Sequence, residues 1–361
     1  MHKKWETYRK YLLPFSLVYG FVIGFRNWLF DISILKSKSY FTPTINVGNI
    51  AIGGTGKTPH VEYLIKLLSP DYHISTLSRG YKRKTKGFLI AEQQHSFEDI
   101  GDEPKQLKYQ FNNVLVSVDE DRQRGIEQLE KLEDKPDVII LDDAFQHRYV
   151  KPGINILLSD YSSPFWEDHI LPVGNLRDNL SQVRRADVVI VSKTPESITA
   201  MSKRVIAKKL KLFPYQNLFF TSIVYGGLEC ITKCKTIVIE QEYAVLMLTG
   251  IANPKHLEQY LVEKFNSVET IEFPDHYSFQ EADFDRIIKK FEAIDAENKI
   301  IVTTLKDAVR LEDNCNFEKL SEIPVFYQNM EIGFLNEKEK DEFNNLILKY
   351  VRNAKRDRKV Y

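Results

Sequence analysis

A glycine-rich stretch between an apolar run and a helical pattern constrains the fold of this chain more than any other segment. It occupies residues 45–59 and reads INVGNIAIGGTGKTP. Glycines allow backbone N–H groups to turn inward around a phosphate, Lys57 can reach the β- and γ-phosphates of a nucleotide, and Thr58 can offer its hydroxyl to Mg²⁺. The positive end of the following helix would face the phosphates. The stretch therefore predicts a P-loop whose nucleotide-binding residues are Gly53, Gly54, Thr55, Gly56, Lys57 and Thr58.

The match to the usual P-loop pattern is imperfect at one position. That pattern has a glycine six residues before the lysine, where this chain has Ala51. Gly48, Gly53 and Gly54 supply backbone freedom at other places. An ordinary glycine-rich turn with a coincidental Lys-Thr pair is the alternative, but the order of strand, loop and helix favours the P-loop. The helical pattern after the loop has one apolar face, formed by Val61, Leu64, Ile65 and Leu68.

Chain length and charge bound the remaining possibilities. The chain has 361 residues, more than one ordinary hydrophobic core accommodates, so two domains are expected. Lys+Arg and Asp+Glu both number 50, and this balance argues against nucleic acid as a partner. The 3 cysteines are expected to be unbridged thiols in a reducing compartment.

The N-terminal segment, residues 1–35, carries an uncharged apolar run with basic flanks. Residues 11–25 read YLLPFSLVYGFVIGF, with lysines and arginines on both sides. The run is shorter than the ~20 residues that a membrane span needs. Its aromatic and basic residues are typical of an amphipathic helix that lies in the interface of an anionic membrane. A helix buried against the domain is the alternative.

Alternating strand and helix patterns predict an α/β fold. In residues 36–217, apolar runs typical of buried parallel strands predict a P-loop NTPase-like domain with a mostly parallel sheet. Residues 241–361 alternate in the same way and predict a second, smaller α/β domain. Residues 218–240 contain two strand-like runs around Gly226 and Gly227, and we expect a two-stranded, hairpin-like linker there. The expected strands lie near 44–47, 74–77, 114–118, 137–141, 154–158, 187–191, 245–249, 269–273, 299–303 and 324–327.

Polar clusters follow several of these strands, at the edge where open α/β sheets bind ligands. The basic cluster at residues 78–84 could meet phosphates or form a solvated loop, and the acidic cluster at residues 101–104 could serve a base and a metal or form a turn. The run VIILDD places Asp142 at the end of a buried strand, as a second Mg²⁺-supporting position beside a P-loop requires. His147, shortly after it, could pair with Asp143 or contact a substrate.

Eight segments occur in an order that resembles one known family. They are VGNIAIGGTGKTP, LSRGYKRK, GDEP, LDDAFQHR, LPVGNLRD, GIANP, FPDHY and TLKDAVRL, within about residues 10 to 311. Together they resemble the tetraacyldisaccharide 4′-kinases, the lipid A 4′-kinases of Gram-negative bacteria. This chain departs from the family pattern at Ala144, Asn175 and Leu305. These departures concern substrate or nucleotide contacts and leave the residues for phosphoryl transfer in place.

The resemblance implies transfer of the γ-phosphate of ATP to the 4′-hydroxyl of a tetraacylated glucosamine disaccharide 1-phosphate, a lipid A precursor. Such a substrate lies in the cytoplasmic face of the inner membrane, which would give the apolar N-terminus a purpose. The resemblance also implies roles for particular residues. These are Asp102 as the general base, His276 as its orienting partner, Thr58 and Asp142 as Mg²⁺ ligands with Asp143 and Glu103 near them, and Arg79 and Arg177 as contacts to substrate or phosphate charge.

Two other classes of protein remain open from the residues alone. A membrane-associated regulatory P-loop NTPase would hydrolyse nucleotide and bind a protein partner, and it would need a segment that senses the γ-phosphate. A soluble small-molecule kinase is the second class, against which the apolar N-terminus argues. Acceptor dependence distinguishes a kinase from a regulatory NTPase, because a kinase consumes ATP only slowly without its lipid.

Overall fold

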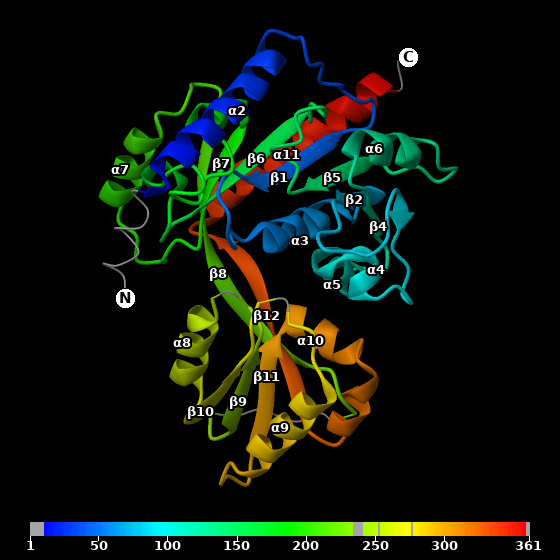
Figure 1. Cartoon of the computed structure of the whole chain (residues 1–361), viewed down its shortest axis with the longest axis vertical. Helices are drawn as coiled ribbons and strands as arrows, with labels where there is room; N and C mark the ends of the chain where they lie inside the picture. Colours follow the sequence, from blue (N-terminus) through cyan, green and yellow to red (C-terminus); the bar gives the residue numbers. More distant parts are fainter. Residues whose placement is uncertain (1–10, 234–240, 252, 276, 359–361) are drawn as a thin grey trace. The chain divides into compact units, whose positions relative to one another are not determined.

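The computed structural model describes residues 11–233, 241–251, 253–275 and 277–358. The chain divides into two compact units (Figure 1). The first consists of Met1–Glu92, Phe111–Val224 and Ile332–Tyr361, and the second of Gln93–Gln110 and Tyr225–Glu331. These bounds differ from the expected ranges 36–217 and 241–361, because residues 93–110 belong to the second unit and the last helix belongs to the first.

The first unit is built on a mostly parallel sheet with the strand order β8-β7-β6-β1-β5-β2-β4-β3. All neighbouring strands in this order run parallel except β3 and β4, which pair antiparallel. Every strand expected for this unit is present, and the α/β class is confirmed. The strands are β1 (Thr44–Asn49), β2 (Ile74–Ser78), β3 (Leu89–Ile90), β4 (Leu115–Val118), β5 (Val138–Asp142), β6 (Ile154–Asp160), β7 (Val188–Ser192) and β8 (Asn217–Cys230).

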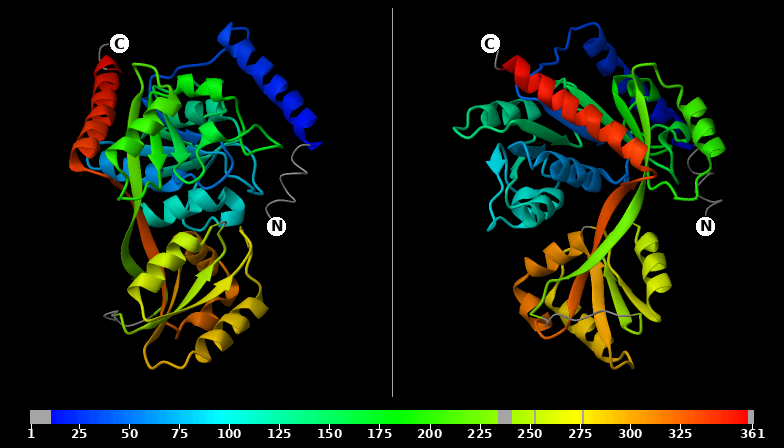
Figure 2. Two further views of the ribbon diagram at one scale, coloured as in Figure 1. Left: turned by 90° about the vertical axis from the view of Figure 1, so that its left-hand side faces the viewer. Right: turned by 180° about the vertical axis from the view of Figure 1, so that it is seen from behind.

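Helices cover both sides of this sheet, with α11 on one side and α2 on the other (Figure 2). The P-loop helix α3 buries Val61, Leu64, Ile65 and Leu68 almost completely, as its apolar face predicts. It also contacts α11 through Tyr63, whose hydroxyl donates to Asn344 Oδ1 at 2.8 Å. The helices of this unit are α2 (Leu13–Asp31), α3 (Lys57–Leu68), α6 (Arg122–Glu130), α7 (Ala200–Leu210) and α11 (Glu337–Arg358), with short 3₁₀ turns η1 (Phe165–Glu167) and η2 (Leu180–Arg185).

The apolar N-terminal run forms α2, and most of that helix is exposed. Only Ser16, Asn27 and Phe30 of its residues are buried. By length and composition alone α2 could cross a membrane, and only 17% of its apolar 18-residue window is buried within the protein. The alternative of a helix buried against the domain does not agree with this exposure.

In the second unit the strands run parallel in the order β10-β9-β11-β12, and β12 also neighbours β8 in the strand order. Its core includes Phe284, Ile287 and Phe291 on one face of α9, which pack against the apolar side chains of β9 and β11. The strands are β9 (Ala244–Thr249), β10 (Ser267–Glu272), β11 (Lys299–Thr304) and β12 (Val325–Phe334). The helices are α4 (Phe97–Ile100), α5 (Asp102–Gln110), α8 (Lys255–Lys264), α9 (Glu281–Glu292) and α10 (Leu305–Glu312), with a 3₁₀ turn η3 (Cys315–Leu320).

The expected hairpin-like linker over residues 218–240 is wrong in its first half. Residues 217–230 form one strand, β8, which runs through Gly226 and Gly227 beside β12 instead of turning back. A glycine within a strand allows close approach of a neighbour, and the Gly226 carbonyl accepts a hydrogen bond of 2.8 Å from Gln328 Nε2. The second expected run, 235–240, lies outside the described residues.

At the end of β8, Cys230 is disulfide-bonded whereas Cys315 is free, so the expectation of unbridged cysteines is wrong for Cys230.

Candidate active site

The loop between β1 and α3 has the backbone that its glycines predict. Gly53 and Gly56 have φ angles of 124° and 80°, a region that residues with side chains rarely adopt. A Cβ atom added at Gly53 or Gly54 would meet no described atom within 4 Å, so the loop is open on that side. An open, glycine-rich loop at the start of a helix fits a phosphate group.

Neighbouring side chains hold this loop in place. Asn49, the last residue of β1, donates from Nδ2 to Thr55 Oγ1 at 2.9 Å. Ser192, the last residue of β7, donates from its hydroxyl to the Thr55 carbonyl at 2.8 Å. Both contacts come from the carboxyl ends of buried strands, so the sheet itself positions the loop.

His60 of α3 ties the end of the loop to β8. Its Nδ1 lies 2.7 Å from the Gly56 carbonyl, and its Nε2 lies 3.1 Å from Thr221 Oγ1. Because a carbonyl can only accept, Nδ1 carries the proton and Nε2 accepts from the Thr221 hydroxyl. Burial lowers the pKa of His60 to about 4, so the ring is neutral near pH 7. Sequence reasoning did not single out this residue, since only the fold brings Thr221 to it.

Lys57, Asp143 and Arg177 meet next to the loop. The Lys57 ammonium lies 3.8 Å from Asp143 Oδ2. Arg177 donates to Asp143 Oδ2 at 3.0 Å and to Oδ1 at 2.8 Å, and it also contacts the carbonyl and side-chain oxygens of Asn49. Burial by itself opposes ionisation of Asp143, but Lys57 and Arg177 hold the pKa of that carboxyl below its usual range. The site is therefore an ionised carboxylate between two cations.

Asp142 occupies the position expected for a metal-supporting carboxylate. It ends β5, is 1% exposed and lies opposite Val47 of β1 in the sheet register. Carboxylate and hydroxyl oxygens are ligands that Mg²⁺ accepts, and this ion takes most of its other ligands from phosphates and water. Among the described residues no group of three or more His, Cys, Asp or Glu side chains could hold a metal ion by itself. Thr58 lies in the first turn of α3 and Asp142 ends β5, and their role as Mg²⁺ ligands beside nucleotide phosphates stays a prediction.

Arg79, Arg122 and His147 lie near these carboxylates and influence one another electrostatically. Arg122, the first residue of α6, is 4% exposed, and its Nε has no hydrogen-bond partner among the described residues. Burial lowers the pKa of Arg122 to about 10, against the opposing effect of Asp143 and Asp142. The sequence did not identify Arg122, because it stands in a run of charged residues that is typical of a solvated turn.

His147 is neutral and does not pair with Asp143. Burial, followed by the charge of Arg122, lowers the pKa of His147 to about 4. The carboxylate within 4 Å of its Nε2 is that of Asp121, at 3.8 Å. Its role as a substrate contact stays a prediction.

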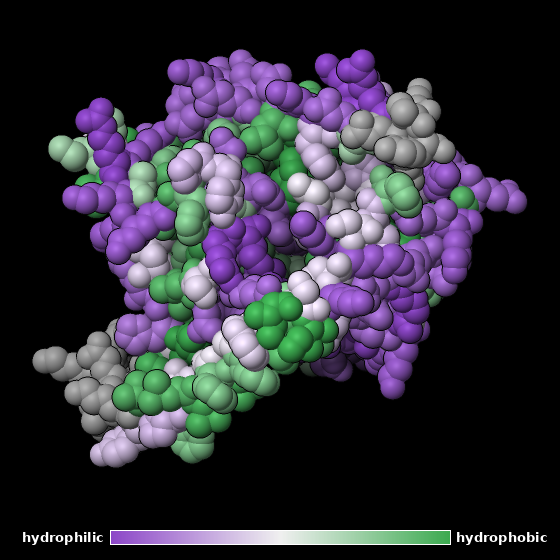
Figure 3. All heavy atoms as spheres, turned by 90° about the horizontal axis from the view of Figure 1, so that it is seen from above, coloured by the Kyte–Doolittle hydropathy of each residue, from purple (hydrophilic) through white to green (hydrophobic). Residues whose placement is uncertain are grey.

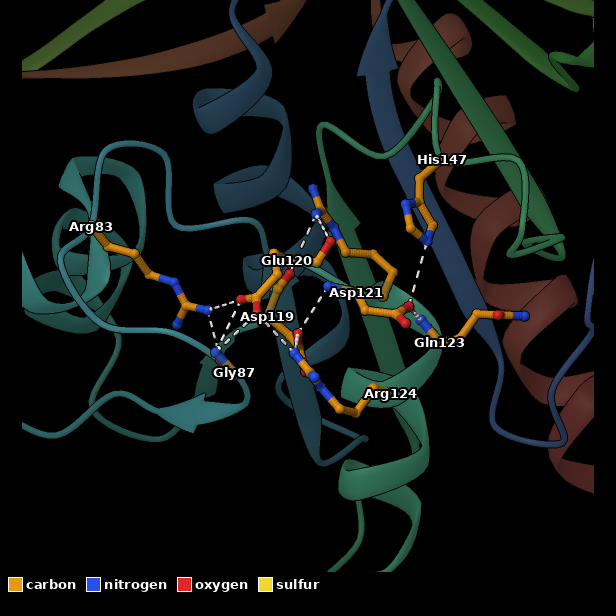
Figure 4. A network of polar contacts seen from close by, with 9 residues as sticks. Arg83, Gly87, Asp119, Glu120, Asp121, Gln123, Arg124 and His147 are labelled. Atoms are coloured by element: carbon orange, nitrogen blue, oxygen red, sulfur yellow. Dashed lines mark hydrogen bonds and ion pairs between the residues drawn. The ribbon is translucent and has the colours of Figure 1, made fainter. Parts of the chain in front are cut away.

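The basic cluster at residues 78–84 is partly used for structure (Figure 4). Arg83 donates to Glu120 at 2.6 Å, and the Gly87 amide donates to the same carboxylate at 3.0 Å. Arg124 bridges Asp119 and Glu120 from the other side, at 2.6 and 3.0 Å. This network holds the loop after β2 against the loop after β4, while Arg79 itself is exposed.

Asp102 and Glu103 belong to the second unit rather than to the P-loop unit in which we expected them. They begin α5, directly after Gly101, whose φ of 93° allows the turn from α4. Arg310 of α10 donates to both carboxylate oxygens of Asp102, at 2.9 and 2.6 Å. His276, the expected partner of Asp102, lies outside the described residues.

Known proteins match the chain over nearly its whole length. A family model described as Tetraacyldisaccharide-1-P 4′-kinase matches residues 8–352. The Tetraacyldisaccharide 4′-kinase of Phocaeicola vulgatus is 44% identical over 354 residues, which are 96% of each chain. The chain belongs to this family. The Tetraacyldisaccharide 4′-kinase of Flavobacterium johnsoniae is 43% identical over 349 residues, which are 95% of this chain and 97% of the relative.

A solved member of the family has the same fold. The crystal structure of LpxK from Aquifex aeolicus in complex with ATP matches with a TM-score of 0.72 and 31% sequence identity, over 95% of this chain and 99% of that chain. The resemblance drawn from the eight motifs is thereby confirmed, and the protein is a kinase of lipid A biosynthesis. Family membership does not favour the alternative of a regulatory NTPase.

Proposed function

We propose that this protein transfers the γ-phosphoryl group of ATP to the 4′-hydroxyl of a tetraacyldisaccharide 1-phosphate at the cytoplasmic face of the inner membrane. The observation that carries the proposal is the open P-loop of β1 and α3, with Lys57 beside Asp143 at its end. Phosphoryl transfer depends mostly on positioning and charge stabilisation. A preformed loop with paired charges at one sheet edge supplies both.

Each group of site residues has a proposed role in binding nucleotide, metal or substrate. Gly53, Gly54, Thr55 and Gly56 present amides to the phosphates, and Lys57 places its charge at the β- and γ-phosphates. Thr58 and Asp142 hold Mg²⁺, with Asp143 beside them; when bound, this ion neutralises phosphate charge. Glu103 is proposed as a further acidic neighbour of the metal. Arg79, Arg177 and His147 face substrate or phosphate charge.

Transfer of the phosphoryl group to the 4′-hydroxyl requires one group that accepts the proton of that hydroxyl. The 4′-oxygen forms a bond to the γ-phosphorus while the bond from that phosphorus to the β-phosphate oxygen breaks, and ADP leaves. Asp102 takes the proton of the hydroxyl as general base, and His276 orients Asp102. A carboxylate suffices for this step, because the phosphoryl acceptor needs little activation in a loose transition state.

The N-terminal helix supports a membrane-surface location through the way it docks. Its polar and small residues face the protein: Ser16 donates to the Ile170 carbonyl at 2.7 Å, and Asn27 donates to Asp178 Oδ1 at 2.7 Å. Gly20 leaves room for Ile170, whose Cδ1 would lie 3.3 Å from an added Cβ. The helix is therefore held by hydrogen bonds, by close approach at Gly20 and by Phe30, which packs edge to face against Tyr149, while most of its other apolar side chains are exposed.

Those apolar side chains form an exposed surface. Phe21 is 73% exposed and Phe25 is 51% exposed, and apolar residues gather in a band on the upper face of the molecule (Figure 3). An uninterrupted apolar helix face with a basic flank binds the headgroup region of an anionic bilayer. The exposed large apolar residues of this segment are Tyr11, Leu12, Leu13, Phe15, Leu17, Val18, Phe21, Val22, Phe25, Trp28, Ile32 and Ile34.

Product analysis tests the proposed activity. Purified protein is incubated with ATP, Mg²⁺ and a disaccharide 1-phosphate lipid, and the lipid product is measured by mass spectrometry. We expect one added phosphoryl group on the non-reducing sugar and slow ATP consumption when the lipid is omitted. ATP hydrolysis at an equal rate with and without lipid, and no phosphorylated product, would instead indicate a regulatory NTPase.

A further inference from the structure

Arg310 is placed to fix the orientation of the Asp102 carboxylate. Its Nε donates to Asp102 Oδ1 at 2.9 Å and its Nη2 donates to Oδ2 at 2.6 Å, so the guanidinium holds both oxygens in one plane. The side chain of Arg310 is 2% exposed, whereas that of Asp102 is 13% exposed. One edge of the carboxylate is thus fixed from inside the unit, while part of the group still reaches solvent.

Arg310 is itself held by a buried acid. Asp307, one turn earlier on α10, accepts at Oδ1 from Arg310 Nη1 at 3.4 Å. Its Oδ2 accepts from the Gly250 amide at 2.9 Å and from the Thr304 hydroxyl at 2.7 Å. Gly250 follows β9 and Thr304 ends β11, so a chain of contacts runs from two buried strands through Asp307 and Arg310 to Asp102. Such support from a rigid sheet is what a precisely oriented functional group needs.

A second ion pair docks the same segment without touching Asp102. Lys105 of α5 lies 3.0 Å from Asp313 Oδ1, and the Phe97 amide donates to Asp313 Oδ2 at 3.0 Å. This pair anchors residues 97–105 to the end of α10. Removing this pair therefore serves as a control for any loss of turnover that arises only because α5 is held less firmly.

We propose that Arg310 is a positioning residue for phosphoryl transfer, which orients Asp102 toward the acceptor hydroxyl. The inference rests on the proposed role of Asp102 as general base. A bidentate arginine holds both oxygens of a carboxylate in one plane, so the direction in which this carboxylate can accept a proton is defined. A lysine at position 310 would hold one oxygen and leave rotation free.

The test compares four single variants and one double variant in steady-state turnover with the lipid acceptor, alongside ATP affinity. Arg310→Gln should lower kcat on the order of 10²-fold with KM for the lipid within a few-fold, since a misplaced catalytic group costs rate more than binding. Arg310→Lys should recover only part of the loss. Asp313→Asn, which removes the docking ion pair, should stay within a few-fold of the original protein. ATP affinity should be unchanged throughout.

Asp102→Ala separates this inference from the proposed function. If Asp102→Ala retains full turnover, the general-base assignment fails, whatever Arg310 does. If Asp102→Ala is inactive while Arg310→Gln loses no more turnover than Asp313→Asn, only the positioning role of Arg310 is overturned. Full activity of a folded Arg310→Lys variant would overturn it as well, so the inference stays testable even if Arg310→Gln does not fold. Adding Arg310→Gln to Asp102→Ala should cause scarcely any further loss, because a positioning residue has nothing left to position.

Discussion

Arg177 holds Asp143 with two parallel hydrogen bonds, of 3.0 and 2.8 Å, at the edge of the P-loop. The same guanidinium reaches the Asn49 carbonyl at 3.2 Å, and Asn49 in turn supports Thr55 of the loop. Arg177 thus links the carboxylate beside Lys57 to the backbone that leads into the loop. Its planar donor fork, and not its charge alone, makes this link.

Replacement of Arg177 should show that geometry matters at this position. We expect Arg177→Lys to lower phosphoryl transfer about 10-fold and Arg177→Gln to lower it further, because neither side chain can make two parallel bonds to one carboxylate. Steady-state kinetics with lipid and ATP measures the effect, with circular dichroism as the check on folding. Unchanged turnover in a folded Arg177→Lys variant would mean that only the charge is required.

Loss of the P-loop lysine should abolish transfer without unfolding the protein. Lys57→Ala removes a point charge at the β- and γ-phosphates, and we expect a loss on the order of 10²-fold or more in kcat. Lys66→Ala, on an exposed part of the same helix, is the matched control and should remain active. A folded Lys57→Ala variant within a few-fold of the original activity would contradict the P-loop assignment.

Acid should destabilise the protein partly through His60. Burial lowers its folded pKa from 6.5 to about 4, so between these pH values the unfolded chain binds more protons. The free energy of unfolding therefore falls as the pH drops through this window, by up to about 3 kcal/mol from this group. His60→Asn keeps a donor for the Gly56 carbonyl but cannot titrate. Denaturant unfolding measured from pH 7 to 4 should show a smaller loss of unfolding free energy in the variant than in the original protein. An equal pH dependence of the two unfolding free energies would show that His60 makes no such contribution.

The exposed face of α2 should carry membrane binding. Phe21→Ser combined with Phe25→Ser removes two exposed aromatic rings, and we expect at least about a 10-fold weaker association with vesicles that contain anionic lipid. Phe41→Ser changes a side chain that is 79% exposed but lies outside α2, so it should bind normally. Co-sedimentation with vesicles is the measurement. Equal binding of all three proteins would place the membrane contact elsewhere.

Asp102 and His276 should act as one unit. Asp102→Ala should cost at least ~10²-fold in turnover, as expected for a lost general base, and His276→Ala should cost less. The double variant should be scarcely worse than Asp102→Ala, since groups in one catalytic unit are strongly non-additive. Nucleotide affinity should change little in all three. Losses that multiply fully would show that the two residues act independently.

Local patterns identified most of the elements correctly, because hydrophobic periodicity depends on neighbouring residues only. The buried face of α3 and the strands of both sheets follow from such patterns. The P-loop was readable for the same reason, since Gly53 to Thr58 are contiguous and the positive φ angles of Gly53 and Gly56 are a local requirement. The hairpin expected at Gly226 failed because glycine favours both a turn and a close strand neighbour, and only the position of Gln328 on β12 decides between them.

The sequence by itself determined the family, the P-loop and the α/β class, because contiguous motifs and periodic apolar runs specify them. Tertiary structure alone decided which charges meet. Arg310 and Asp102 are more than two hundred positions apart, and no local pattern relates a residue near the end of α10 to the first residue of α5. The same holds for Asn27 with Asp178, and for His60 with Thr221. Such pairs depend on which strands become neighbours, which is settled by burial of the whole sheet and not by any single segment.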